Sequence, residues 1–157
     1  MSPRGWFDVR KAVPGLRGLA LHVLPVSREK EVVEALEAAG FVISTLEGSG
    51  VRDEASFFRE AARALPLPAY FGHNWDALDE CLHDLGDERE RRRAFLWRAA
   101  DVSLAADAQV FFDAFQVLTE TVRDLGSGDP PTQFEVFLLG ESQAFGGSGG
   151  RAGQKRG

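Results

Sequence analysis

The chain has 157 residues, of which 44% are hydrophobic and 27% charged, a composition typical of one folded domain. Its formal net charge of −6 disfavours general nucleic-acid binding, which requires a basic surface, and fits a protein that meets basic partners. The single cysteine, Cys81, excludes an internal disulfide. No signal peptide or membrane-spanning apolar stretch is visible, so we expect a cytoplasmic protein with no membrane partner.

The first part of the chain predicts an arm, a strand, a helix and a second strand. Residues 1–18 mix Pro, Gly, Arg and aromatic residues without a period, which indicates an irregular arm. Residues 19–26 (LALHVLPV) are a candidate short strand. Ser27 is a candidate N-cap for an amphipathic helix that ends at Gly40, the usual residue just past a helix end. Residues 41–45 (FVIST) predict an apolar strand.

Two helices are expected next, separated by an aromatic loop. Asp53 is a candidate N-cap for a helix that runs to Ala64, where apolar residues recur at helical spacing. Pro66 and Pro68 end that helix. Asn74 is the candidate N-cap of the second helix. The apolar row of this second helix, which should face the core, consists of Trp75, Leu78, Leu82 and Leu85.

The remainder predicts a strand at residues 94–98 (AFLWR), a helix at 107–125, a last strand at 134–139 (FEVFLL) and a flexible Gly-rich tail at 146–157. Apolar strands separated by helices favour parallel pairing through right-handed crossovers. We therefore predict an α/β fold with a small parallel sheet of about three strands packed with helices. This domain should span residues 19–145.

The strongest functional signal lies between Pro66 and Glu88, a stretch with six carboxylates and no Lys or Arg. Like charges four residues apart on a helix cost about 0.2–0.5 kcal/mol per pair. A sequence selected for stability alone would include lysines there, so we expect a positively charged partner to dock on this helix. On composition alone, the same acids also fit a solvated helix face, with Asp76 favoured by the helix dipole. Tyr70 and Phe71 likewise fit residues that anchor the loop by packing onto the core.

An enzyme is a weaker interpretation of the same segment. Cys81, His73 and His83 could form a thiol site, but Cys81 falls among the inward leucines, where a free cysteine is usually a small core residue. Asp76 and Glu80 are four residues apart and could share a proton or a metal, yet no convergent ligands are identifiable. No phosphate loop or hydrolase motif is present. We expect no catalytic residue, metal or cofactor.

The string L-P-x-Y-F-G-x-N-W-D-A-L-x-E-C-L at residues 67–82 resembles the signature of the barstar family of ribonuclease inhibitors. Residues 95–98 (FLWR) resemble the family's next strand, and 116–120 (QVLTE) weakly resemble a later helix that carries another interface acid. The resemblance covers about residues 40–140. It implies an α/β fold and a non-catalytic inhibitor that blocks a secreted, basic, guanyl-specific ribonuclease inside the cell that makes it.

Carried over by motif position, the resemblance implies that Tyr70 stacks at the rim of the enzyme's active site. Asp76 would pair with an enzyme arginine, and Glu80 would enter the phosphate-binding pocket. The partner-binding residues expected on this basis are Tyr70, Phe71, Gly72, Asn74, Asp76, Asp79, Glu80 and Glu120. The protein should be a monomer that forms a 1:1 complex with its nuclease, and it should not bind nucleic acid directly.

Three positions depart from the family pattern. Glu80 stands where the best-known member has the shorter Asp, while Asp79 and Leu85 stand where it has aromatic residues. These departures concern the partner more than the fold. They leave two alternatives: an immunity protein against another nuclease toxin that reuses the acidic helix, and a small hydrolase or metal protein that uses Asp76, Glu80 and the histidines.

Overall fold

A parallel sheet forms the centre of the structure, a computed structural model that describes residues 5–18, 20–68 and 71–145. The strands are β1 (His22–Pro25), β2 (Val42–Glu47), β3 (Arg92–Arg98) and β4 (Gln133–Gly140), paired in the order β1-β4-β3-β2. All three pairings are parallel. The predicted α/β fold is confirmed, but the sheet has four strands where about three were expected. The additional strand is β1, the candidate at 19–26, which pairs with β4 and forms an edge.

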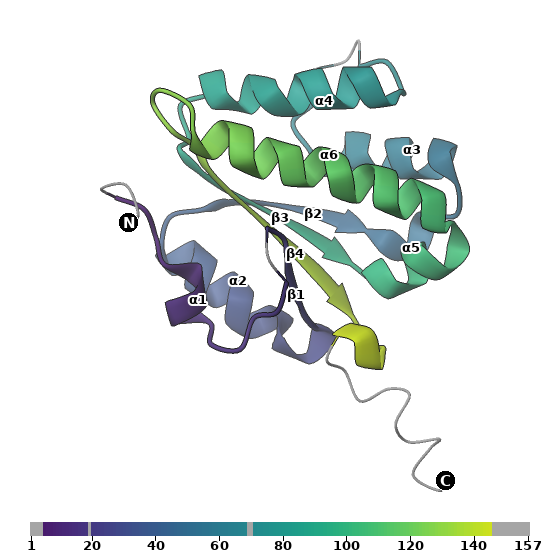
Figure 1. Cartoon of the computed structure of the whole chain (residues 1–157), viewed down its shortest axis with the longest axis horizontal. Helices are drawn as coiled ribbons and strands as arrows, with labels where there is room; N and C mark the ends of the chain where they lie inside the picture. Colours follow the sequence, from purple (N-terminus) through teal and green to yellow (C-terminus); the bar gives the residue numbers. More distant parts are fainter. Residues whose placement is uncertain (1–4, 19, 69–70, 146–157) are drawn as a thin grey trace, which may run out of the picture.

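Helices cover both faces of this sheet (Figure 1). They are α1 (Val9–Ala12), α2 (Glu29–Ala38), α3 (Glu54–Ala64), α4 (Trp75–His83), α5 (Ala100–Ala106) and α6 (Ala108–Gly126). Alternate residues of β3 enter opposite cores, because successive side chains of a strand point to opposite faces. Phe95 and Trp97 pack in the core under α3, α4 and α6, whereas Ala94 and Leu96 pack in the core shared with α1 and α2.

The predicted helix caps are largely as expected. Asp53 Oδ1 accepts from the Ser56 N–H at 2.9 Å, and the Ser56 hydroxyl oxygen accepts from the Asp53 N–H, so the two residues form a reciprocal capping box. Gly40 adopts φ +82° just past α2, a conformation that glycine reaches without strain. The expected Ser27 cap is wrong. A 3₁₀ turn at Val26–Arg28 precedes α2, and no side chain caps that helix.

Residues 5–18, expected to be an irregular arm, contain α1 and pack into the second core. Val9 of α1 is buried there, as are Val13 and Leu16, which follow the helix in the chain. Buried Gln133 of β4 exchanges two hydrogen bonds with the Phe7 backbone, at 2.9 and 2.8 Å. The segment is therefore attached to the sheet by side-chain and backbone contacts. The expected tail, 146–157, lies outside the described residues.

A buried hydrogen-bond relay joins the ends of β2 and β3 to α5, a helix that the sequence did not predict. Trp97 Nε1 donates to Ser103 Oγ at 3.0 Å, and Ser103 Oγ donates to the Gly48 carbonyl at 2.8 Å. All three residues are buried, so no water replaces a lost bond. One hydroxyl thus satisfies both an indole N–H and a backbone carbonyl.

Replacing Ser103 with Ala should destabilise the fold, because two buried polar groups lose their partner at once. Each unsatisfied group costs about 1–3 kcal/mol. Urea unfolding measures the change, with Ser49→Ala as the control, since Ser49 is exposed in the turn after β2. Equal unfolding midpoints for the two variants would contradict the role given to Ser103.

Candidate functional site

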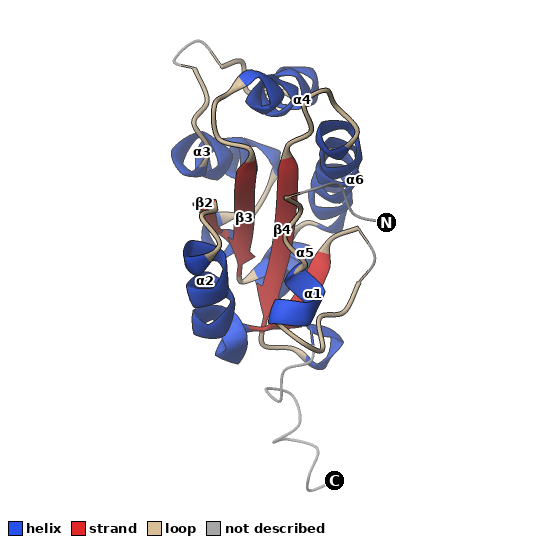
Figure 2. Cartoon of the chain, turned by 90° about the vertical axis from the view of Figure 1, so that its left-hand side faces the viewer, coloured by secondary structure: helices blue, strands red, loops and turns tan. Residues whose placement is uncertain are grey.

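The site is built on α4, which lies over α3 and α6 beyond the starting ends of β3 and β4 (Figures 1 and 2). The Asn74 side-chain oxygen accepts from the Ala77 N–H at 2.9 Å and caps the helix as predicted. Leu78 and Leu82 are buried, as is Leu85 just beyond the helix, and all three join the main core. Because this row is packed in the core, the opposite face of α4 points toward solvent.

The outward face of α4 forms an open surface hollow, here called the acidic depression, lined by Asp76, Asp79, Glu80, His83 and Asp84. Asp76, Glu80 and Asp84 are spaced four residues apart and are exposed along one row of the helix. Within the described part of the chain, none of these three takes part in an ion pair. The row therefore presents uncompensated negative charge to the solvent.

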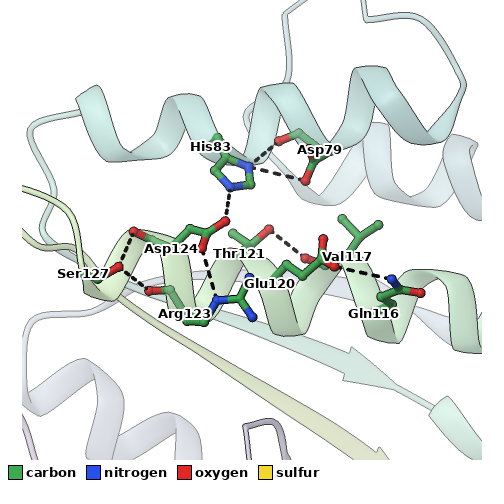
Figure 3. A network of polar contacts seen from close by, with 9 residues as sticks. All are labelled: Asp79, His83, Gln116, Val117, Glu120, Thr121, Arg123, Asp124 and Ser127. Carbon is green, nitrogen blue, oxygen red and sulfur yellow. Dashed lines mark hydrogen bonds and ion pairs between the residues drawn. The ribbon is translucent and has the colours of Figure 1, made fainter.

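His83 joins the end of α4 to α6 (Figure 3). Its Nδ1 lies 2.8 Å from the Asp79 carbonyl oxygen and 3.4 Å from Asp79 Oδ1, while its Nε2 lies 2.9 Å from Asp124 Oδ2. Both ring nitrogens face oxygens that only accept, so both bonds form together only when the imidazole is protonated. The hydrogen bond to Asp124 is the main cause of the raised pKa of His83, and it lowers the pKa of Asp124.

His83 and Asp124 were not among the predicted site residues. Asp124 lies 41 residues further along the chain, and no local pattern indicated the contact. The spacing of Asp79 and His83, four residues apart on a helix, was the one available signal. The acidic depression therefore includes an imidazole whose raised pKa favours its protonated form, and Asp79 is the acid of α4 that lies beside it.

The aromatic loop before α4 has mixed roles. Phe71 is partly buried against the main core, with its ring 6.3 Å from that of Phe58, so it anchors the loop. Gly72 and Asn74 are exposed. A Cβ at Gly72 would lie 3.2 Å from Asn74 Nδ2, closer than most real contacts, so glycine leaves room for the cap. Tyr70, the expected rim residue, lies outside the described residues.

Glu120 lies in a second, adjacent hollow, here called the Trp75 groove, which is lined by Trp75, Asp113, Gln116, Val117 and Glu120. Four of these residues form one face of α6, and the fifth is the first residue of α4. Glu120 accepts a bond from Gln116 Nε2 at 3.3 Å (Figure 3). The predicted site residues of the two helices thus divide between two neighbouring hollows.

Cys81 lies at the edge of the leucine row and is partly buried. Partial burial raises the pKa of its thiol, and the charges of Asp84 and Glu80 raise it further. A protonated thiol is a poor nucleophile. Among the described residues, no group of three or more His, Cys, Asp or Glu side chains is placed to hold a metal ion. No helix in this part of the chain has the length and apolarity to cross a bilayer.

The bond pattern at His83 predicts a pH-dependent stability. The raised pKa of His83 means that its stabilising contribution is complete below about pH 6.5, the usual value for histidine, and is lost as the pH rises through the higher folded-state value. The lowered pKa of Asp124 means that its contribution is present above about 3.8 and is lost as the acid protonates.

His83→Gln should therefore be less stable than the parent near pH 5.5 and should approach the parent at alkaline pH. Unfolding free energies measured in urea from pH 5 to 9 test this. The control is His73→Gln, because His73 is exposed and takes no part in an ion pair among the described residues. A difference between parent and His83→Gln that stays constant across this pH range would show that the imidazolium does not stabilise the fold.

A comparison with known families covers the same part of the chain. The model of the family described as Barstar (barnase inhibitor) matches residues 41–138, from the residue before β2 into β4. The match includes both hollows and covers more than half of the 157 residues. A comparison with curated proteins found no match. Because the family model covers the acidic helix and most of the parallel sheet that supports it, this chain belongs to the barstar family.

Proposed function

We propose that the protein is a non-catalytic inhibitor of a basic ribonuclease of the barnase type, and that α4 covers the enzyme's active site. The observation that carries this proposal is the row of Asp76, Glu80 and Asp84, which is exposed and has no ion pair within the described residues. Family membership supports a nuclease as the class of partner. The nuclease supplies the positive charge that this row lacks.

The chemistry of the two surfaces is complementary. A ribonuclease active site presents cationic side chains that hold the phosphate of RNA. A carboxylate accepts the same charge-assisted hydrogen bonds as a phosphate oxygen. The cap at Asn74 and the buried Leu78 and Leu82 hold the acids on a preformed helix, so little conformational entropy is lost on binding.

Within this proposal, Asp76 pairs with an arginine of the enzyme, Glu80 enters the phosphate-binding pocket and Tyr70 stacks at its rim. Phe71, Gly72 and Asn74 shape the loop and the cap that present these residues. The complex contains one copy of each protein. The inhibitor works in the cytoplasm of the cell that makes the nuclease.

Glu80→Ala should weaken binding to barnase, because the enzyme's phosphate-binding cations would lose their partner. Removing one member of a buried charge pair at an interface costs roughly 2–5 kcal/mol. That range includes measurements on the barnase–barstar pair itself, so it is transferred from a relative. Titration calorimetry against barnase tests it, with Glu37→Ala on α2 as the control acid.

A change below about 0.5 kcal/mol, the usual range for surface substitutions, would contradict the role of Glu80. The function itself is tested by RNA cleavage. Barnase activity should fall in proportion to added protein and vanish at a 1:1 ratio, whereas barnase that stays active in excess protein would overturn the proposal.

Association should be fast and strongly dependent on salt, because the acids of the acidic depression and the Trp75 groove attract a basic cleft over several ångströms. Electrostatic steering raises on-rates to about 10⁸–10⁹ M⁻¹s⁻¹ at low salt. The screening length falls from roughly 10 Å at 0.1 M to about 3 Å at 1 M. Stopped-flow mixing with barnase across this range should show a steep fall in the on-rate and a smaller change in the off-rate. An on-rate independent of salt would mean that the acids are only a solvated face.

A second candidate is an immunity protein against a different nuclease toxin. The observation that favours it is Asp79, which stands where the best-known relative has an aromatic residue and is engaged by His83. An inhibitor surface that differs from that of the best-known relative at this position is consistent with a different nuclease as the partner. The two candidates are distinguished by an inhibition assay in which a basic DNase domain replaces barnase. The protein is added in increasing amounts and DNA cleavage is measured. Inhibition of the DNase and not of barnase would favour the second.

A further inference from the structure

We propose that residues 146–157 bind back onto this protein, in a hollow at the carboxyl ends of the strands. This part of the chain, here called the basic segment, contains Arg151, Lys155 and Arg156 and no acidic residue. The hollow lies at the end of the sheet away from α4 (Figures 1 and 2). The inference therefore stands apart from the proposed function and does not depend on it.

The hollow, here called the strand-end hollow, is built from the ends of all four strands. Glu47, Arg98 and Gly140 are the last residues of β2, β3 and β4, and Val26 directly follows β1. In open α/β sheets, ligands bind outside the carboxyl ends of the strands. The hollow measures about 280 Å³, at the lower limit of the roughly 300–1,000 Å³ of small-molecule pockets, so its size suits a single long side chain.

The strand-end hollow has an excess of negative charge. Three acids line it: Glu47, Asp101 and Glu141. The cation of the lining is Arg98, whose Nη1 lies 2.7 Å from Glu47 Oε2 and whose Nε lies 3.1 Å from Glu29 Oε1. Asp101 and Glu141 form no ion pair within the part of the chain that the structure describes. Two uncompensated carboxylates thus lie beside an arginine that is already paired, which favours a cationic group as the occupant.

The lining also includes apolar surface that suits the stem of a long basic side chain. Val102 of α5 is 48% exposed and borders the hollow together with Val26 and Ala99. Arginine and lysine place their aliphatic stems along apolar surface and keep the charged head among polar groups. The hollow therefore accommodates both parts of such a side chain.

The chain passes this hollow immediately before the basic segment begins. Asp101 Oδ2 accepts hydrogen bonds from the Glu141 N–H at 2.9 Å and from the Ser142 N–H at 3.0 Å. A Cβ at Gly140 would lie 2.8 Å from Asp101 Cγ and from Phe145 Cγ, so the close passage requires a glycine. Phe145, the last described residue, is buried in the main core. The point from which the basic segment continues is therefore fixed beside the strand-end hollow.

The reach of the chain favours this hollow over the acidic depression. Arg151 is the sixth residue after Phe145, and an extended chain spans at most about 3.6 Å per residue, so its reach is roughly 20 Å. The eight residues of β4 alone span about 26 Å, and α4 lies beyond the start of that strand. Covalent attachment also gives the segment an effective concentration of about millimolar, at which a weak contact is occupied. Bound in this way, the cations lie far from the surface that we assign to the nuclease.

The first experiment measures where the basic segment lies in the full chain. A nitroxide spin label is attached at Gly153→Cys, with Cys81→Ala removing the native thiol, and broadening of the backbone N–H signals is measured by NMR at low salt. We expect the signals of Val102 and Glu141 to broaden and that of Glu80 on α4 to stay sharp. Sharp signals at the strand-end hollow, or broadening on α4 in their place, would overturn the proposal.

The matched control separates binding from simple attachment, which by itself brings the label near the hollow. It carries the same label with Arg151→Gln, Lys155→Gln and Arg156→Gln, and it should show clearly less broadening at the hollow. High salt should reduce the broadening of the parent toward this control, because the screening length shortens. Equal broadening in parent and control would overturn the proposal. So would broadening of an unlabelled ¹⁵N protein by an added spin-labelled copy, since the contact would then join two molecules.

The second experiment changes the hollow and leaves the basic segment intact. Glu141→Gln removes the charge of an exposed acid that has no ion pair in the described ranges, so the fold keeps its contacts. Trypsin cleavage after Arg151, followed by mass spectrometry at low salt, should become about twofold faster or more, consistent with the loss of one exposed ion pair. Asp84→Asn, which removes an exposed acid from α4, is the control and should be cleaved at the parent rate. A rate that Glu141→Gln leaves unchanged, or that both variants raise equally, would overturn the assignment of the hollow.

Discussion

The packing of Leu78, Leu82 and Leu85 against α3 and α6 is the constraint on which the rest of the site depends. A helix that buries one row of leucines has no freedom to rotate, so its opposite row has a fixed direction. That direction holds Asp76, Glu80 and Asp84 in solvent. The same packing brings Trp75 onto Phe57 and Phe58, and it places the end of α4 within hydrogen-bonding reach of Asp124. This one apolar interface therefore sets the positions of the acidic depression, the Trp75 groove and the His83–Asp124 contact.

The distribution of charge over α4 and α6 is uneven in an informative way. Asp79 and Asp124 share His83, whereas Asp76, Glu80, Asp113 and Glu120 have no cationic partner within the described residues. Like charges on neighbouring turns oppose folding by a few tenths of a kcal/mol per pair. The fold tolerates this repulsion because its stability comes from two hydrophobic cores on the two faces of the sheet. Acids with no cationic partner among the described residues remain available to a partner.

Much of the fold followed from local patterns in the sequence. The caps at Asp53 and Asn74, the leucine row of α4 and the apolar strands on either side of α6 each depend on residues close in the chain, so a single segment was enough to predict them. The segments that were missed, α1 and α5, are short helices of four and seven residues. A short helix shows too few periods to be recognised, and its stability comes mainly from tertiary contacts.

The site was predictable only in part, because some of its contacts join residues that are far apart in the chain. The acids of α4 form a local cluster and were visible as such, but the His83–Asp124 contact spans 41 residues, and the Trp75 groove combines two helices. Such pairings depend on how α4 and α6 pack against each other. Cys81, expected among the inward leucines, is partly buried, because the helical period places it beside the leucine row, at the boundary between core and surface.

The departure from the family pattern at position 79 has a physical account. An acid at position 79 adds a fourth carboxylate to the acidic depression, and this would increase the repulsion among Asp76, Glu80 and Asp84. His83 lies one turn later, with Nδ1 3.4 Å from Asp79 Oδ1, and its hydrogen bond to Asp124 favours the protonated ring. When protonated, His83 offsets the added carboxylate locally and leaves the row of three acids unpaired. An aromatic residue at position 79 would need no such cation. Asp79, His83 and Asp124 are thus linked into one group between α4 and α6.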